Sequence, residues 1–253
     1  MKIGLFDSGL GGLTVWNAVR TAFPKADLVY YGDTLHLPYG EKSPSAIQGY
    51  AKAITNFLVE QGCTTIVIAC NSASAVAGKF LAEQFPDLAF FNVIDPVVQH
   101  VGNQQWKNIG VIGTRATVDS GAYEMGIKEV APQMEVKCLP TPLLVPLIEE
   151  GFIHTQITAG VFGHYVKEGL GAVDAILPGC THYPLLADWA ASIVPNSQWI
   201  NTPKVVASHI KNELGTVEGQ GTSAFFLSDS TVAFETQASS LFGVEGPWET
   251  KRL

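Results

Sequence analysis

The chain contains an internal repeat, in which a first buried strand ends at small polar residues and a later strand ends at a cysteine. The paired segments are 2–8 (KIGLFDS) with 108–114 (NIGVIGT), and 65–73 (TIVIACNSA) with 175–183 (AILPGCTHY). The two strand ends are 63 residues apart in the first copy, Asp7 to Cys70, and 67 residues apart in the second, Gly113 to Cys180. Such a chain is most simply built as two similar halves that face each other across a cleft.

Hydrophobic periodicity indicates the fold class of each half. Short apolar runs alternate with helical patterns, which is typical of βαβ units and a parallel sheet. Helical faces run from Ile47 to Leu58 and from Val205 to Leu214, the second followed by Gly215 as a C-cap. The expected strands are 2–6, 28–31, 65–69, 89–93, 108–112, 136–139, 173–177, 198–200 and 224–227. We therefore expect an α/β protein of two pseudosymmetric, three-layer αβα domains, flavodoxin-like or Rossmann-like, with largely parallel sheets.

We place the domain boundaries near Pro96 and Pro203. Residues 1–96 together with 206–253 are expected to form one α/β domain, and residues 97–205 the second. The last segment is expected to add a helix, a strand and another helix to the first domain. Because open α/β sheets bind ligands at the carboxyl ends of their strands, we expect the site between the two domains.

Composition excludes two kinds of partner. A net charge of -8, a pI near 5.2 and only 15 Lys and Arg residues provide no basic footprint for nucleic acid. The sequence has neither a charged, apolar leader nor an apolar run of about 18 residues, so we expect a cytoplasmic protein with no membrane partner. An anionic ligand would have to be held by local groups such as backbone N–H donors.

Two of the four cysteines lie where chemistry is expected. None forms a CxxC pair, and in a reducing compartment all four are free thiols. Cys70 and Cys180 end buried strands and precede small polar residues and a first helical turn, a setting that favours the thiolate. Cys63 and Cys138 are interpreted as packing residues.

No metal or cofactor is expected. The pair Cys180 and His182 provides two ligands, whereas a closed zinc site needs four. The glycine-rich run 9–12 has neither the spacing of a dinucleotide-binding motif nor that of a P-loop. A glycine-rich turn at the start of a helix is nevertheless a good anion-binding site.

Asp7 and His182 are the other candidates for proton transfer. Asp7 is either an N-cap of the following helix or a proton acceptor near Cys70. His182, two residues after Cys180, is expected to act as a general acid or to contact substrate. Capping or solvation is favoured for Asp33, Glu149 and Glu150. Surface or helix-face positions are favoured for His36, His100, His154, His164 and His209.

Two thiols that face each other across a cleft are suited to inverting a stereocentre. One thiolate takes a proton from one face of a carbon while the opposed thiol gives a proton to the other face. A cysteine protease would instead need a single cysteine with a histidine base oriented by a third group.

At these residues the chain resembles the bacterial glutamate racemases, cofactor-independent isomerases of the aspartate/glutamate racemase superfamily. Six motifs carry the resemblance: FDSGLGGLTV (6–15), YYGDTLHLPYGEKS (30–43), ACNSASA (69–75), GTRATVDSGAY (113–123), PLLVPLIEEG (142–151) and GCTHYPL (179–185). The first and the last separate the chain from the aspartate and hydantoin racemases of that superfamily. The resemblance implies two pseudosymmetric α/β domains with the active site between them.

The resemblance also implies residue roles and partners. Cys70 would take the α-proton from D-glutamate, assisted by Asp7, and Cys180 would take it from L-glutamate, assisted by His182. The implied substrate-holding residues are Asp7, Ser8, Pro38, Tyr39, Gly40, Asn71, Ser72, Thr114, Thr117, Thr181 and His182. Further implications are a homodimer, no cofactor, and a supply of D-glutamate for peptidoglycan and hence for cell shape.

The sequence departs from the family pattern at two places. Ser72 stands where the family usually has threonine, which keeps the hydroxyl. Leu35 and His36 stand where alanine and arginine are expected, so a contact made there by an arginine is absent; Arg115 is the candidate cation nearby.

Two other functions remain open. The first is a racemase or decarboxylase of the same superfamily that acts on another α-substituted acid, such as aspartate or an arylmalonate. The second is a regulatory binding role, since some glutamate racemases also inhibit DNA gyrase; the lack of a basic face ranks it last.

Overall fold

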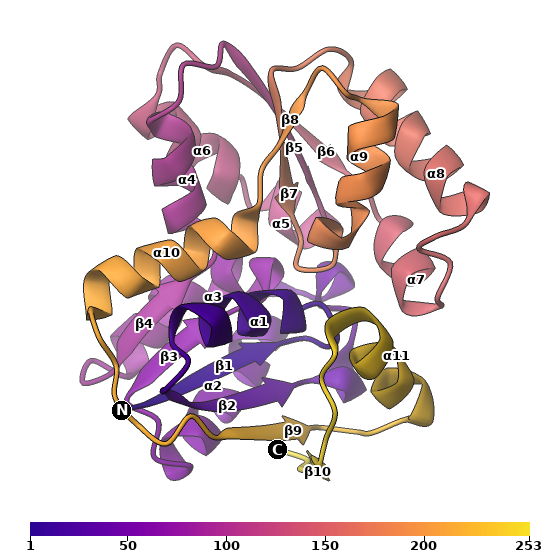
Figure 1. Ribbon diagram of the computed structural model, residues 1–253. Helices are drawn as coiled ribbons and strands as arrows, with labels where there is room; N and C mark the ends of the chain where they lie inside the picture. Colours follow the sequence, from indigo (N-terminus) through magenta and orange to yellow (C-terminus); the bar gives the residue numbers. More distant parts are fainter.

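The computed structural model describes all 253 residues and contains two parallel β-sheets, each flanked by helices (Figure 1). The six-stranded sheet has the order β10-β9-β2-β1-β3-β4, and the four-stranded sheet the order β6-β5-β7-β8. The first sheet consists of β1 (Lys2–Asp7), β2 (Asp27–Gly32), β3 (Thr65–Ile68), β4 (Ala89–Asn92), β9 (Ser223–Leu227) and β10 (Trp248–Thr250). The second consists of β5 (Asn108–Gly113), β6 (Glu135–Pro140), β7 (Ala175–Gly179) and β8 (Gln198–Trp199).

The internal repeat appears as a repeated strand order. The run β2-β1-β3-β4 has the same connectivity as β6-β5-β7-β8, and every pairing in both runs is parallel. The expected α/β class with two parallel sheets is therefore confirmed. The C-terminal segment extends only the first sheet, through β9 beside β2.

Helices cover both faces of each sheet. The α-helices are α1 (Leu13–Ala22), α2 (Pro44–Glu60), α3 (Asn71–Gln84), α4 (Asp95–Gly102), α5 (Arg115–Asp119), α6 (Ala122–Val130), α7 (Leu144–Glu149), α8 (Gln156–Gly163), α9 (Ala187–Ile193), α10 (Thr202–Leu214) and α11 (Val232–Phe242). Short 3₁₀ turns are η1 (Thr34–His36), η2 (Tyr39–Glu41) and η4 (Tyr183–Leu186), and η3 (His164–Leu170) is a π-helical turn.

Three apolar clusters hold the layers together. The α2 and α3 side chains, such as Ile54 and Leu81, pack against one face of the first sheet. A larger cluster of 33 buried residues continues from the opposite face, through α1, α10 and α4, to α6 and the second sheet. The third joins the outer face of the second sheet to α7, α8 and the following elements. Because the largest cluster includes residues of both sheets, packing fixes one half against the other.

The chain crosses between the sheets in two helices. The first crossing passes through α4 and the second through α10, and the predicted boundary residues Pro96 and Pro203 lie in the first turns of these helices. Figure 1 shows α10 running beneath the second sheet and above α1. No helix is long and apolar enough to cross a membrane.

Two strand predictions need correction. The C-terminal segment contains a further strand, β10, which pairs with β9 after α11; with three residues it is too short for an alternating pattern to be recognised. Strand β7 begins and ends two residues later than predicted, because its register with β5 pairs Pro178 with Ile112 and Gly179 with Gly113. Sheet register thus outweighs the low strand propensity of proline and glycine.

Candidate active site

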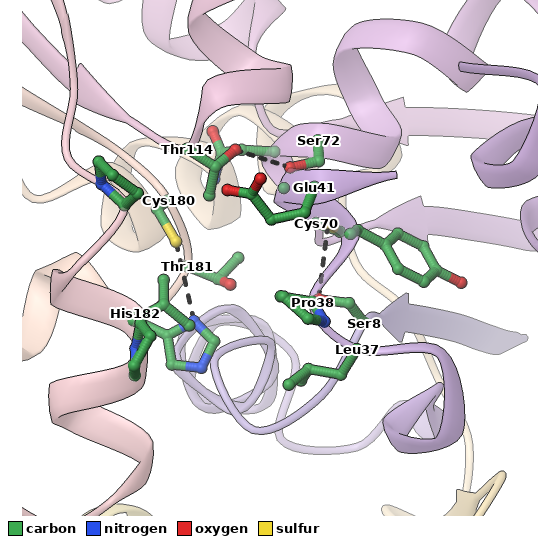
Figure 2. Close-up of a pocket in the computed structure, with 16 residues that line it drawn as sticks. Ser8, Leu37, Pro38, Glu41, Cys70, Ser72, Thr114, Cys180, Thr181 and His182 are labelled. Atoms are coloured by element: carbon green, nitrogen blue, oxygen red, sulfur yellow. Dashed lines mark hydrogen bonds between the residues drawn. The ribbon is translucent and has the colours of Figure 1, made fainter. Parts of the chain in front are cut away.

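A cavity of about 180 Å³ lies between the two halves, at the carboxyl ends of the central strands (Figure 2). Both Cys70 and Cys180 line it. The implied substrate-holding residues that also line it are Ser8, Pro38, Tyr39, Gly40, Asn71, Ser72, Thr114, Thr181 and His182. Asp7 and Thr117 do not line the cavity but bond to residues that do.

Cys70 lies between the end of β3 and the start of α3, as its N-cap residue. Its Sγ is 3.9 Å from the Ser8 hydroxyl, and the residue is buried. Burial raises the pKa of the Cys70 thiol, the negative charge of Asp7 raises it further, and the Ala73 and Ser8 N–H groups offset only part of the shift. Desolvation therefore outweighs the N–H donors of the helix N-terminus, which were expected to favour the thiolate.

Cys180 lies in the equivalent position of the second half, after β7. Its Sγ is 3.7 Å from Nδ1 of His182. The segment that follows is the 3₁₀ turn η4 and not the expected start of an α-helix; α9 begins only at Ala187. Here a side chain, His182, replaces the helix N-terminus that faces Cys70.

His182 is held by a carboxylate on its far side. Its Nε2 is 2.8 Å from Oε1 of Glu149, the last residue of α7. Burial would lower the pKa of His182, but the bonds to Cys180 and Glu149 together outweigh it and raise that pKa well above its ordinary value. The three side chains therefore form a thiol–imidazole–carboxylate chain, in which the carboxylate favours the imidazolium form.

The prediction that Glu149 is a capping or solvated residue is wrong. Its side chain is 22% exposed, and Gln237 of α11 donates a hydrogen bond to its backbone carbonyl. A glutamate in the last turn of a helix faces the negative end of the helix dipole, which is unfavourable without a positive partner. The placement of Glu149 at the end of an apolar helical segment was therefore the one signal in the sequence that it needs a positive partner.

Asp7 ends β1 and is fully buried. Its Oδ2 accepts N–H bonds from Gly9 at 2.9 Å and Gly12 at 3.0 Å, and Oδ1 accepts the Thr181 hydroxyl at 3.3 Å. Burial raises the pKa of Asp7, while His182 and the N–H donors oppose the shift. Asp7 makes no side-chain cap to α1, so of the two interpretations the N-cap is excluded.

The glycine loop after Asp7 has no room for side chains. A Cβ on Gly12 would overlap the Asp7 side chain and lie 2.5 Å from the Tyr30 hydroxyl, and one on Gly11 would lie 2.5 Å from Nδ1 of His182. These glycines allow the loop to pack directly against the site.

Replacing Gly12 by alanine is expected to lower the free energy of unfolding by about 1–3 kcal/mol or more, because the added methyl group overlaps a buried carboxylate. The measurement is thermal and urea unfolding of the purified variant. Gly49→Ala is the matched control: Gly49 lies inside α2 with nothing within 4 Å of its added Cβ, so helix propensity predicts a gain of about 0.5–1 kcal/mol. Equal stability of the two variants would contradict the steric explanation.

Hydroxyl groups join the two halves on the α3 and α5 side of the cavity. The Ser72 Oγ is 2.9 Å from Thr114 Oγ1 and 3.4 Å from Thr117 Oγ1. The Tyr123 hydroxyl donates to Asn71 Oδ1 at 2.7 Å, also across the interface. Bonds of this kind fix the position of the polar groups that face the cavity.

A second buried carboxylate supports the segment that carries Pro38 and Tyr39. Asp33 accepts the Tyr39 hydroxyl at 2.6 Å and is 2.9 Å from Nδ1 of His36. The His36 ring stacks on Tyr50, with 4.1 Å between ring centroids. The prediction that Asp33 is a capping or solvated residue is therefore wrong. His36, which pairs with Asp33, occupies the position at which the family pattern has arginine.

The remaining cysteines have no contact with the cavity. Cys63 packs in the α2–α3 cluster, and Cys138 packs partly buried at the edge of the largest cluster. Both interpretations as packing residues are confirmed. No group of three His, Cys, Asp or Glu side chains has an arrangement that would hold a metal ion.

Two α/β halves with parallel sheets, each of which contributes a cysteine to one cavity between them, define the class as an isomerase of the racemase type. Residues 14–210 match the family model described as Asp/Glu/Hydantoin racemase, and the chain belongs to this family. A relative from Aquifex aeolicus, "Glutamate racemase", is 40% identical over 246 residues, which cover 97% of this chain and 95% of the relative.

Solved structures agree. "Crystal structure of glutamate racemase from Francisella tularensis subsp. tularensis SCHU S4 in complex with D-glutamate" has a TM-score of 0.90 and 30% identity, covering 100% of this chain and 97% of that one. The glutamate racemase of Aquifex pyrophilus has a TM-score of 0.85 and 37% identity, covering 99% and 98% of the two chains.

Proposed function

We propose that the protein interconverts L- and D-glutamate without a cofactor, by proton transfer at the α-carbon between Cys70 and Cys180. The observation that carries the proposal is that both thiols line one cavity, one from each half, and each has its own ionisable neighbour. The names of the relatives, and the D-glutamate bound in the Francisella structure, support the choice of substrate.

In the direction from L to D, Cys180 acts as the base. His182 accepts the Cys180 proton, the thiolate removes the α-proton of L-glutamate, and the Cys70 thiol gives its own proton to the opposite face. Burial keeps Cys70 protonated at rest, which suits this role as acid. Glu149 stabilises the imidazolium that forms at His182.

In the direction from D to L, the roles of the two thiols exchange. Cys70 must then lose a proton, and Asp7 is the buried carboxylate whose charge acts on it. Burial raises the pKa of Asp7, which makes this carboxylate a stronger base than an exposed aspartate. The protein thus uses a carboxylate beside one thiol and an imidazole–carboxylate pair beside the other.

The two carboxylates of the substrate are held by hydroxyl and amide groups. Ser72, Thr114, Asn71 and Thr181 line the cavity, and Ser72 and Asn71 lie in the first turn of α3, whose N–H groups and dipole favour an anion. Ser8, Tyr39 and His182 complete the polar lining. No lysine or arginine lines the cavity, so charge is compensated by hydrogen-bond donors.

Incubation with L-glutamate in D₂O under reducing conditions tests the proposal. We expect the optical signal to decay and the D-glutamate formed early to carry deuterium at the α-carbon, because the acid thiol exchanges with solvent. Recovered L-glutamate should stay protiated at early times, since the proton that one thiol removes is not the one that the other returns. Absence of exchange would contradict the assignment, and faster exchange on aspartate or an arylmalonate would favour the other superfamily activities.

We also propose that the product serves peptidoglycan synthesis in a bacterial cytoplasm, and that the protein acts as a homodimer. Expression in a strain that requires D-glutamate should restore growth, and the Cys70→Ser variant should not. Light scattering on the purified protein measures the oligomeric state.

A further inference from the structure

One acidic side chain lines the proposed substrate cavity, and its counter-charge lies outside. Glu41, the last residue of η2 in the first half, is the only Asp or Glu among the lining residues, and no Lys or Arg is among them. Nε of Arg115, the first residue of α5 in the second half, is 3.6 Å from Oε1 of Glu41. This ion pair therefore spans the two halves beside the cavity.

The ion pair lies at the mouth of the cavity. Both side chains are slightly more than half exposed, at 54% and 55%. A second hollow, of about 360 Å³, shares Gly40 and Glu41 with the substrate cavity and is also lined by Arg115 and Lys42. Figure 2 shows the Glu41 carboxylate beside Thr114. Glu41 thus lies between the substrate cavity and an outer hollow that is lined by the cationic side chains of Arg115 and Lys42.

The backbone that carries Glu41 packs closely against the second half at Thr114. A Cβ on Gly40 would lie 2.7 Å from the Thr114 side chain, and Thr114 is bonded to Ser72. An unpaired carboxylate fixed here would repel any anion that enters. Arg115 removes that repulsion without placing a cation among the substrate-holding groups.

We propose that Arg115 acts as a charge-screening residue: it neutralises Glu41 at the mouth and so permits a dianionic amino acid to enter. The inference rests on the proposed function only in requiring that the ligand carry two carboxylates. An exposed ion pair of this kind contributes little to stability, so its effect should appear in substrate affinity and not in folding.

Replacing either member of the ion pair by a neutral side chain should change KM in different directions. In Arg115→Gln the unscreened Glu41 should raise KM for both enantiomers about fivefold, as expected for unit charges several ångströms apart at a protein surface. Glu41→Gln should leave KM equal to or below that of the wild type, and the double variant should resemble Glu41→Gln. Arg115→Lys should keep the wild-type KM, and kcat should stay within about twofold throughout.

A purely mechanical latch between the halves would behave differently. Both single variants would then raise KM in the same direction and the double variant would be no better, which would overturn the proposal. An unchanged KM in Arg115→Gln would also overturn it. The matched control is the exposed pair Lys25 and Glu218, 3.1 Å apart near the opposite ends of the strands, where Lys25→Gln and Glu218→Gln should leave KM unchanged.

Calorimetric binding of glutarate separates this inference from the proposed function. Glutarate has two carboxylates and no stereocentre, so its affinity is measured whether or not the protein racemises glutamate. Arg115→Gln should weaken glutarate binding about fivefold, and added salt should reduce the difference. A wild type that binds glutarate but exchanges no α-proton would reject the racemase alone, and equal affinities for wild type and Arg115→Gln would reject the charge screen alone.

Discussion

Replacing either Cys70 or Cys180 by serine is expected to abolish measurable racemisation, a loss of at least about 1,000-fold in kcat/KM. A hydroxyl is a far weaker acid than a thiol, so serine can neither form the base nor return the proton at neutral pH. Because one proton must leave and another must arrive on opposite faces, either substitution stops turnover in both directions. Racemisation is measured as the decay of the optical rotation of L- or D-glutamate, with exchange of the α-proton in D₂O as a second readout.

A substituted substrate shows which thiol faces which enantiomer. With 3-chloroglutamate, removal of the α-proton expels chloride from the β-carbon, so HCl is eliminated and no second acid is needed. Cys70→Ser should still eliminate from the L-configured compound, through Cys180, and Cys180→Ser from the D-configured one, through Cys70. The opposite pairing would reverse the proposed assignment, and elimination by neither variant would indicate misfolding, which circular dichroism checks.

The repeat made most of the fold predictable. Matching the segment around Cys70 to the one around Cys180 required two halves with the same strand order, and the two sheets have it. Local patterns of this kind are readable because each half must bury its own sheet and helices. The C-terminal strands that extend the first sheet have no counterpart in the second half, and of these β10 was missed.

From the pattern of strands alone, the candidate site was predictable only where the residues lie at strand ends; Pro38, Tyr39 and Gly40 came from the resemblance to the family. Cys70, Cys180 and His182 were found because each follows a buried strand, and all three line the cavity. Glu149 was missed because it reaches His182 from 33 positions away in the chain, at the end of a helix. The effect of the helix N-terminus on Cys70 is local and readable in the sequence, whereas the burial that raises the pKa of its thiol depends on packing with residues far away in the chain, such as Phe6 and Ile47.

Replacement of His182 or Glu149 is expected to cause the second large loss of racemase activity. Replacing His182 by asparagine removes the group that takes the Cys180 proton, and loss of a positioned acid–base group costs about 100- to 10,000-fold. Glu149→Gln keeps the size and one oxygen acceptor but loses the charge that stabilises the imidazolium, so a smaller loss, about tenfold, is expected. The matched control is Glu150→Gln, at the neighbouring exposed position.

The two enantiomers restrict how these losses can appear. L- and D-glutamate have equal free energies, so the equilibrium constant is unity, and kcat/KM must be the same in both directions for every variant. A defect on the Cys180 side therefore cannot show as one-way loss of kcat/KM. It should show in the chloroglutamate elimination, where His182→Asn slows reaction of the L-configured compound and spares the D-configured one.

The pH profile separates a positioning role for Glu149 from a merely structural one. Burial alone would lower the pKa of His182, and the bonds to Cys180 and Glu149 raise it. Without the Glu149 charge this pKa should fall, so the imidazolium is lost at lower pH and the alkaline limb of kcat/KM moves to lower pH. Glu149→Asp, which retains the charge, should restore the limb in part. If Glu149→Gln instead lowers kcat/KM equally at every pH and leaves the alkaline limb in place, Glu149 has only a packing role.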